Sequence, residues 1–234
     1  MRSLGKLALT IVVVALAAGP ALAQRGQFGG GFGGPGMLLQ NKSVQQELKL
    51  SEEQTSKIRK VSQEIRAKYK DEFAKAQELE GDEQRQKFQE LGKKVNEETN
   101  KAMADILKPE QAKRFKEIQL QVRGPEAFTD EQVAKDLKLT DEQKDKIKTI
   151  MEDFGKEARE VFQGAQGDFQ AAMKKVQALR KETMEKVTEV LTADQKKNWK
   201  EMTGKPFELK MEGFGRPGGG GGKKKKAKDK DKEI

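Results

Sequence analysis

Neither cysteine nor histidine occurs among the 234 residues, and their absence removes several kinds of site at once. Without cysteine there is no disulfide, thiol nucleophile or thiolate metal ligand, and without histidine there is no imidazole base and no usual zinc ligand. The Gly-x-Ser-x-Gly and phosphate-binding Gly-x-x-x-x-Gly-Lys-Ser/Thr patterns are also missing. We therefore expect no enzyme, with no catalytic residue, no cofactor and no bound metal.

Long apolar runs are missing too, except near the amino end. There the run Leu7–Ala18 follows a positively charged start and precedes Ala21-Leu22-Ala23, which has the small-x-small pattern of a signal-peptidase site. The run is too short to serve as a stable anchor across a bilayer core of about 30 Å. The sequence predicts a signal peptide over residues 1–23, cleaved after Ala23, with an uncleaved tether as the alternative. The expected location is the periplasm, or outside the cell if the protein is secreted.

A charge excess of one sign is nearly absent from the central part of the chain, although the net charge is +9. The signal region contributes +2, the glycine-rich flanks +2 and the tail Lys223–Ile234 +4, so that Met37–Gly213 retains only +1. Mixed charges on a nearly neutral body indicate a solvated surface and no specific nucleic-acid interface. The lysine-rich tail is interpreted as a solubilising end, or alternatively as a weak binder of anionic polymer or lipid.

Two glycine-rich segments, 24–36 and 213–222, contain too few apolar side chains to offset their chain entropy, so both are predicted to be flexible linkers.

Proline is scarce and does not occur in 40–108 or 126–205, which leaves room for long helices because an interior proline costs a helix about 3 kcal/mol. Apolar residues in these regions recur at helical spacing, and no stretch alternates as a strand would. The predicted fold class is all-α. The stripes are Ile58, Val61, Ile65, Tyr69 and Phe73; Phe88, Leu91, Val95, Ala102, Met103 and Ile106; Ile147, Ile150, Phe154, Ala158 and Val161; and Met173, Val176, Leu179, Thr183, Val187 and Val190.

The helical body contains two similar halves. Val44–Gln54 matches Val133–Gln143 at an offset of 89 residues. Later, at an offset of 84, Ile106-Leu107 matches Val190-Leu191 and Phe115–Ile118 matches Trp199–Met202. A five-residue deletion near Gly164 reconciles the two offsets. The pattern predicts a tandem duplication, with a first repeat over 37–124 and a second over 125–212.

A short motif, Leu-Ser/Thr-x-x-Gln, recurs in both halves. Its hydroxyl can accept from the amide three residues later, and its glutamine can reach back to the cap's own amide, which together form a capping box. We therefore predict that the motif starts helices and contacts no ligand. Its copies are Leu50, Ser51 and Gln54; Leu139, Thr140 and Gln143; Leu191, Thr192 and Gln195; a variant, Leu107 and Gln111, in which Lys108 cannot cap; and Phe128–Gln132, in which phenylalanine replaces leucine.

On these motifs each half resembles the LTxxQ family of periplasmic proteins, which includes the chaperone Spy and the stress regulator CpxP. The resemblance covers about Val44–Met202. It implies helical hairpin repeats that form a cradle, whose concave side holds unfolded clients without ATP. Spy-like subunits dimerise, so two fused repeats imply a pseudo-dimeric cradle within one chain. Some relatives bind metals through histidine, and this property is not carried over to a chain that has none.

The resemblance therefore implies an exported, ATP-independent chaperone-like protein whose partners are unfolded or partly folded envelope proteins. One alternative is a CpxP-like regulator that docks on a sensor protein, and another is a structural interaction module. Four aromatic residues are candidate client contacts, but each can equally belong to the core. They are Phe115, Phe162, Phe169 and Trp199.

Overall fold

A computed structural model describes residues 34–165 and 167–210, and every regular element in these ranges is a helix. The predicted all-α class is thus confirmed for this part of the chain. The predicted signal peptide, most of the first glycine-rich segment, and the whole of 213–234 lie outside the described residues. None of the described helices is both long enough and apolar enough to cross a membrane.

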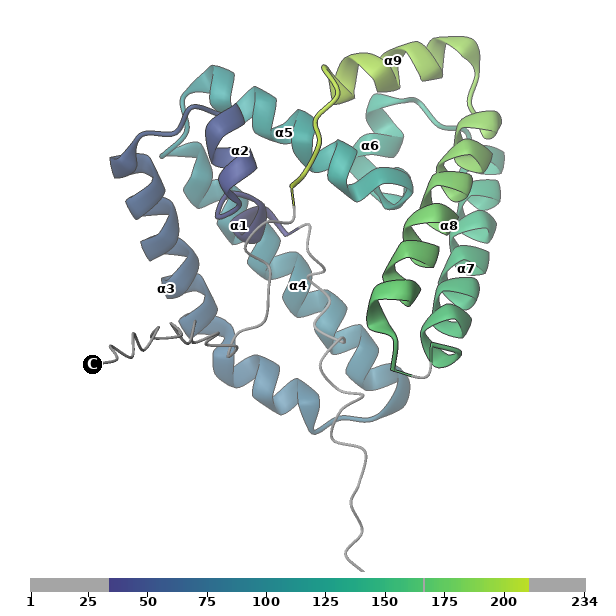
Figure 1. Cartoon of the computed structure of the whole chain (residues 1–234), viewed down its shortest axis with the longest axis horizontal. Helices are drawn as coiled ribbons and strands as arrows, with labels where there is room; N and C mark the ends of the chain where they lie inside the picture. The colour runs from purple at the N-terminus through teal and green to yellow at the C-terminus, as the bar shows by residue number, and fades with distance from the viewer. Residues whose placement is uncertain (1–33, 166, 211–234) are drawn as a thin grey trace, which may run out of the picture.

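Two long hairpins, α3–α4 and α7–α8, make up most of the molecule: in Figure 1 α3 lies on the left, α4 runs diagonally through the middle, α7 and α8 lie on the right, and α5, α6 and α9 lie across the top. Each hairpin is a pair of antiparallel helices packed along their apolar stripes. The elements in chain order are α1 (Pro35–Leu38), α2 (Lys42–Glu47), α3 (Glu52–Gln77), α4 (Gly81–Ala104), α5 (Pro109–Arg123), η2 (Gly124–Thr129), α6 (Glu131–Asp136), α7 (Asp141–Gln163), α8 (Phe169–Val190) and α9 (Ala193–Thr203).

The same order of elements occurs twice in the described residues. A short turn of helix, a six-residue helix, a long hairpin and a final helix run from α1 to α5, and again from η2 to α9. The second hairpin is shorter, with helices of 23 and 22 residues against 26 and 24 in the first. Its first helix ends at Gln163 and its second begins at Phe169, on either side of the place where the deletion is predicted. This order agrees with a duplication, which itself stays a prediction.

The first glycine-rich segment needs a correction at its end. Pro35 and Gly36, predicted to belong to a flexible linker, lie in α1, and Pro35 is buried. A proline suits the first position of a helix because its fixed φ is already helical, and α1 is held against α3 and α4 by the fully buried Leu38. The dipeptide Gly34-Pro35 recurs as Gly124-Pro125 at the start of η2, which is a sequence signal for an ordered element.

Each half contributes side chains to the hydrophobic core of the other half. Leu120, from α5 of the first half, packs in the core of the second. Phe207 and Leu209, which follow α9 at the end of the second half, pack against the core of the first half that contains Leu38, Ile58 and Phe115. A separate cluster fills the lower part of the α3–α4 hairpin, and its buried members are Ile65, Tyr69, Ala76, Phe88 and Leu91.

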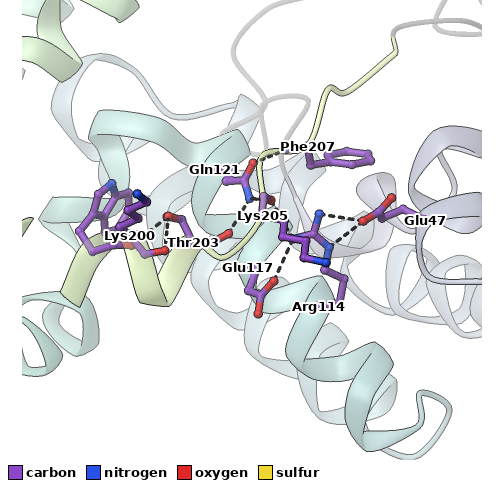
Figure 2. Close-up of polar contacts among 9 residues, drawn as sticks. Glu47, Arg114, Glu117, Gln121, Lys200, Thr203, Lys205 and Phe207 are labelled. Carbon is purple, nitrogen blue, oxygen red and sulfur yellow. Dashed lines mark hydrogen bonds and ion pairs between the residues drawn. The ribbon is translucent and has the colours of Figure 1, made fainter. Parts of the chain in front are cut away.

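Residues Gly204–Lys210, which we call the C-terminal strap, join the end of the second half to the first (Figure 2). The Gln121 side chain donates to the carbonyl oxygens of Thr203 (2.5 Å) and Lys205 (2.8 Å) and accepts from the Phe207 amide (2.7 Å). Further along, Asn41 Nδ2 donates to the Lys210 carbonyl at 2.8 Å. The strap is thus fixed at both ends.

Arg114 stands beside the strap, between two carboxylates. It pairs with Glu47 of α2 at 2.7 Å and with Glu117 of its own helix at 2.8 Å, and it also donates to the Lys205 carbonyl at 2.9 Å. These contacts hold the Glu117 carboxylate directly against Gly204, where an added Cβ atom would overlap it. Glycine at position 204 therefore provides space as well as a positive φ of 62°.

This geometry predicts unequal costs for two alanine substitutions. Gly81→Ala meets nothing within 4 Å at φ +58°, so it should cost only the conformational penalty of about 1 kcal/mol. Gly204→Ala should cost about 2 kcal/mol, because it must also displace Glu117 from Arg114. Urea unfolding of both variants measures the difference, and equal losses would contradict the contact.

Candidate functional site

The Leu-Ser/Thr-x-x-Gln motif begins helices, as predicted. Ser51, Thr140 and Thr192 are the N-caps of α3, α7 and α9, and each forms a complete capping box with the glutamine three residues later. In the variant motif the Lys108 side chain makes no cap, but the Lys108 amide donates to Gln111 Oε1 at 2.9 Å. The glutamine half of the box is therefore kept even where the hydroxyl is missing.

The fifth copy of the motif works differently from the other four. Helix α6 is capped by Asp130, one residue later than the motif predicts, and Thr129 Oγ1 instead donates to the Glu126 carbonyl. Burial acts to raise the pKa of Asp130, but its ion pair with Arg123 at 3.0 Å and the amides it accepts from hold that pKa below its usual value. A carboxylate caps a helix well because it faces the positive end of the helix dipole.

The motif glutamines also pair with each other within each half, a contact that the motif itself does not predict. In the first half Gln54 Nε2 donates to Gln111 Oε1 at 2.7 Å and to the Ile106 carbonyl at 2.8 Å. Gln111 Nε2 donates in turn to the Leu48 carbonyl at 3.0 Å and to Gln54 Oε1 at 3.3 Å. The starts of α3 and α5 are joined through two side-chain amides that satisfy one another.

The second half repeats this arrangement. Gln143 Nε2 donates to Gln195 Oε1 at 2.7 Å and to the Val190 carbonyl at 2.8 Å, while Gln195 Nε2 donates to Gln143 Oε1 at 2.9 Å and to the Lys138 carbonyl at 3.3 Å. We call each arrangement a glutamine pair. Because all its donors and acceptors are used within the fold, it offers no free group to a ligand. The motif leucines pack in the hydrophobic cores next to the glutamine pairs: Leu107, Leu139 and Leu191 are buried and Leu50 is half-buried.

The four candidate client contacts divide into two kinds. Phe115 and Trp199 are 4% and 8% exposed and belong to the cores of the first and second halves. Phe162 and Phe169 are 42% and 61% exposed, and their rings stack on each other with centroids 5.9 Å apart. The core alternative thus holds for Phe115 and Trp199, whereas Phe162 and Phe169 are exposed and stay candidate client contacts.

The α7–α8 hairpin leaves more of its apolar stripe open than the α3–α4 hairpin does. Ile147 is the only buried residue of α7, although α3 buries four residues over a comparable stripe. The remaining stripe of the second hairpin is half-buried and leads down to the exposed ring pair Phe162/Phe169. Its members are Phe154, Val161, Met173, Val176 and Leu179.

A groove of about 810 Å³ lies where the two halves meet, and we call it the inter-repeat groove. It is lined by α4 and α5 of the first half and by α6 and the residues just before it in the second half. Apolar side chains lie beside charges of both signs around it. The apolar members are Met103, Leu107, Phe115, Leu120 and Val133, and the charged members are Lys93, Glu97, Lys116, Arg123, Asp130, Glu131, Lys135 and Asp136.

Comparisons with protein-family models, curated proteins and solved structures found no match to this chain. The resemblance to the LTxxQ family therefore stays a prediction carried by the motifs alone. Within residues 34–165 and 167–210 no three acidic side chains gather in a way that could hold a metal ion.

Proposed function

We propose that this protein is an exported, ATP-independent chaperone-like protein that binds unfolded or partly folded proteins of the cell envelope. The observation that carries the proposal is the inter-repeat groove, where apolar side chains lie beside charges of both signs, and the open stripe of α7–α8 supplies further apolar surface elsewhere on the protein. Unfolded chains expose apolar side chains interspersed with charges, and the groove offers both kinds of contact. The groove takes its lining from both halves, in keeping with the proposed pseudo-dimeric cradle.

Apolar contact with a client removes hydrocarbon surface from water and is not directional, so it suits clients of many sequences. Charges of both signs on the rim speed the first encounter through electrostatic attraction. Individual contacts on such a surface are weak and solvated. A client can therefore leave as its own folding withdraws its apolar side chains, without an input of energy from the protein.

The first test is aggregation of a chemically denatured enzyme diluted into buffer with the purified protein and no nucleotide. We expect light scattering to fall as the protein approaches equal stoichiometry. Scattering that is unchanged at that ratio, for several substrates, would contradict the proposal. It would favour the alternative in which the protein docks on one folded partner.

A double substitution tests whether the exposed ring pair Phe162/Phe169 belongs to the client-binding surface. Phe162→Ser with Phe169→Ser should require about three times more protein for the same suppression, because it removes the two largest exposed apolar side chains in the described part of the chain. Its stability should change by less than about 1 kcal/mol, since both side chains are already exposed. Gln163→Ser with Gln170→Ser, at neighbouring exposed positions, is the matched control and should leave suppression unchanged.

A further inference from the structure

Each half carries a groove between its six-residue helix and the start of the following long helix. The α2–α3 groove encloses about 500 Å³ and the α6–α7 groove about 650 Å³. The two grooves are lined at equivalent positions, at the offset of 89 residues that relates the halves. Gln46, Lys49, Thr55 and Arg59 in the first correspond to Lys135, Lys138, Lys144 and Lys148 in the second.

The α6–α7 groove is the more basic of the two. Four exposed lysines line it, and Glu131 is the only acidic residue among its lining. Lys144 pairs with Asp141 at 2.9 Å, whereas Lys135, Lys138 and Lys148 have no ion-pair partner within 4.0 Å among the described residues. Three ammonium groups around one groove repel each other, and an anionic partner would relieve that repulsion.

The backbone at Lys138 adds a second observation. Its φ of +52° places it in the left-handed region, where it closes the turn after α6: its amide bonds the Lys135 carbonyl at 3.0 Å and the Leu139 amide bonds the Ala134 carbonyl at 2.9 Å. Glycine is the residue that favours this position of a helix end. Lys49 occupies the equivalent turn of the first half with φ +50°, so in both grooves a lysine stands where the backbone favours another residue and keeps its charge on the groove.

Two features of the groove indicate which kind of partner it fits: the apolar residues at its base, and the fact that its positive charges are lysines. Phe128, Leu139 and Ile147 form an apolar floor, which suits a side chain better than a phosphate group. No arginine lines the groove, although arginine is the residue whose planar group binds phosphate through two parallel hydrogen bonds. Both features favour a polypeptide over a phosphate-bearing polymer or lipid.

We propose that the α6–α7 groove docks a segment of another protein in which acidic side chains flank an apolar one. The carboxylates would meet the lysines while the apolar side chain rests on the floor. The parts of this chain outside the described residues are poor occupants, because residues 1–33 contain no acidic residue and residues 211–234 carry a net +4. The proposal does not depend on the chaperone function, and a failed aggregation test would leave it standing.

The test is fluorescence polarisation of a short labelled peptide with glutamates on both sides of one leucine, titrated with the full chain. We expect Lys135→Gln/Lys138→Gln/Lys148→Gln to weaken binding roughly ten-fold, since each lost charge pair removes a modest, additive contribution. Lys146→Gln/Lys174→Gln/Lys181→Gln removes the same charge from exposed positions outside the groove and should weaken it less than about two-fold. Added salt should weaken the unaltered protein more than the groove variant.

Three results would overturn the proposal. Equal losses in the two triple variants would show a general charge effect. A peptide with serine in place of leucine that binds as tightly would show that the floor is not used. Anionic phosphatidylglycerol vesicles that lose binding to the groove variant, while the peptide does not, would assign the lysines to a lipid surface. Circular dichroism of each variant checks that it is folded.

Discussion

Replacing Trp199 with alanine should lower the free energy of unfolding by about 3–5 kcal/mol, the largest effect expected of any single substitution discussed. The indole is 8% exposed, lies in the core of the second half and packs against the Phe128 ring with centroids 4.3 Å apart. Alanine would remove this burial and leave a cavity that the neighbouring helices fill only in part. Because Trp199 is the only tryptophan, unfolding must be followed by far-ultraviolet circular dichroism.

Phe169→Ala is the matched control for Trp199→Ala. That aromatic side chain is 61% exposed, so its loss should cost less than about 1 kcal/mol. If Trp199→Ala does not fold, Trp199→Leu, which retains part of the buried surface, should lie between the two. Similar small losses at Trp199 and Phe169 would contradict the assignment of Trp199 to the core.

Gln195→Glu is expected to cost about 3 kcal/mol at neutral pH, although it changes a single side-chain nitrogen to oxygen. Gln195 is 8% exposed, and its Nε2 donates to Gln143 Oε1 at 2.9 Å. A carboxylate there places negative charge against two acceptors, Gln143 Oε1 and the Lys138 carbonyl, and leaves Gln143 Oε1 with the Thr140 amide as its one remaining donor. Gln89→Glu, at an exposed position of α4, changes the same atoms and should alter stability by less than about 0.5 kcal/mol.

The loss caused by Gln195→Glu should depend on pH in a defined direction. The folded protein favours the protonated carboxyl, which can donate as the amide did, so the pKa of this group is raised in the folded state above its unfolded value of about 4.3. The loss is then small below the unfolded pKa, grows as pH rises through it and levels off above the folded pKa. Urea unfolding at several pH values checks this, and a loss independent of pH would show that the pair tolerates the charge.

The features that the sequence predicted well are local ones. The capping boxes at Ser51, Thr140 and Thr192 depend on residues three apart, and the hairpins follow from apolar stripes at helical spacing. Both depend only on residues that are close together in the chain, so both can be predicted from the sequence. The prediction that Pro35 belongs to a flexible linker was wrong. It was based on the high glycine content of 24–36 and did not take into account that Gly34-Pro35 recurs as Gly124-Pro125.

The features that escaped prediction depend on distant parts of the chain. Gln54 and Gln111 are 57 residues apart, and Leu120 crosses into the core of the other half. Arg180 of α8 donates to the Val122 carbonyl at 2.7 Å, and so satisfies the end of α5 in the other half. No periodicity encodes such partners. The sequence likewise could not separate Trp199 from Phe169, because the burial of a side chain depends on how much surface the neighbouring elements supply.

The candidate site was only partly accessible for the same reason. The sequence named Phe162 and Phe169 among four aromatics, but the inter-repeat groove is formed by helices from both halves and has no signature in any one segment. The four lysines of the α6–α7 groove are not distinguished in the sequence from the many other lysines, and they line one groove because α6, the turn at Lys138 and α7 pack together.

Because the C-terminal strap packs against the first half, the first half can be completed only after the second half has been synthesised. The Asn41 side chain cannot form its hydrogen bond until the Lys210 carbonyl, 169 residues later in the chain, has been synthesised. The core of the first half likewise remains incomplete until Phe207 and Leu209 pack against it. Closing so long a loop comes late, because its entropy must be offset by contacts formed earlier. A ribosome-bound chain that lacks these residues therefore displays an unfinished apolar surface, and a premature stop codon shortly after α9 would yield a product prone to proteolysis rather than a smaller working protein.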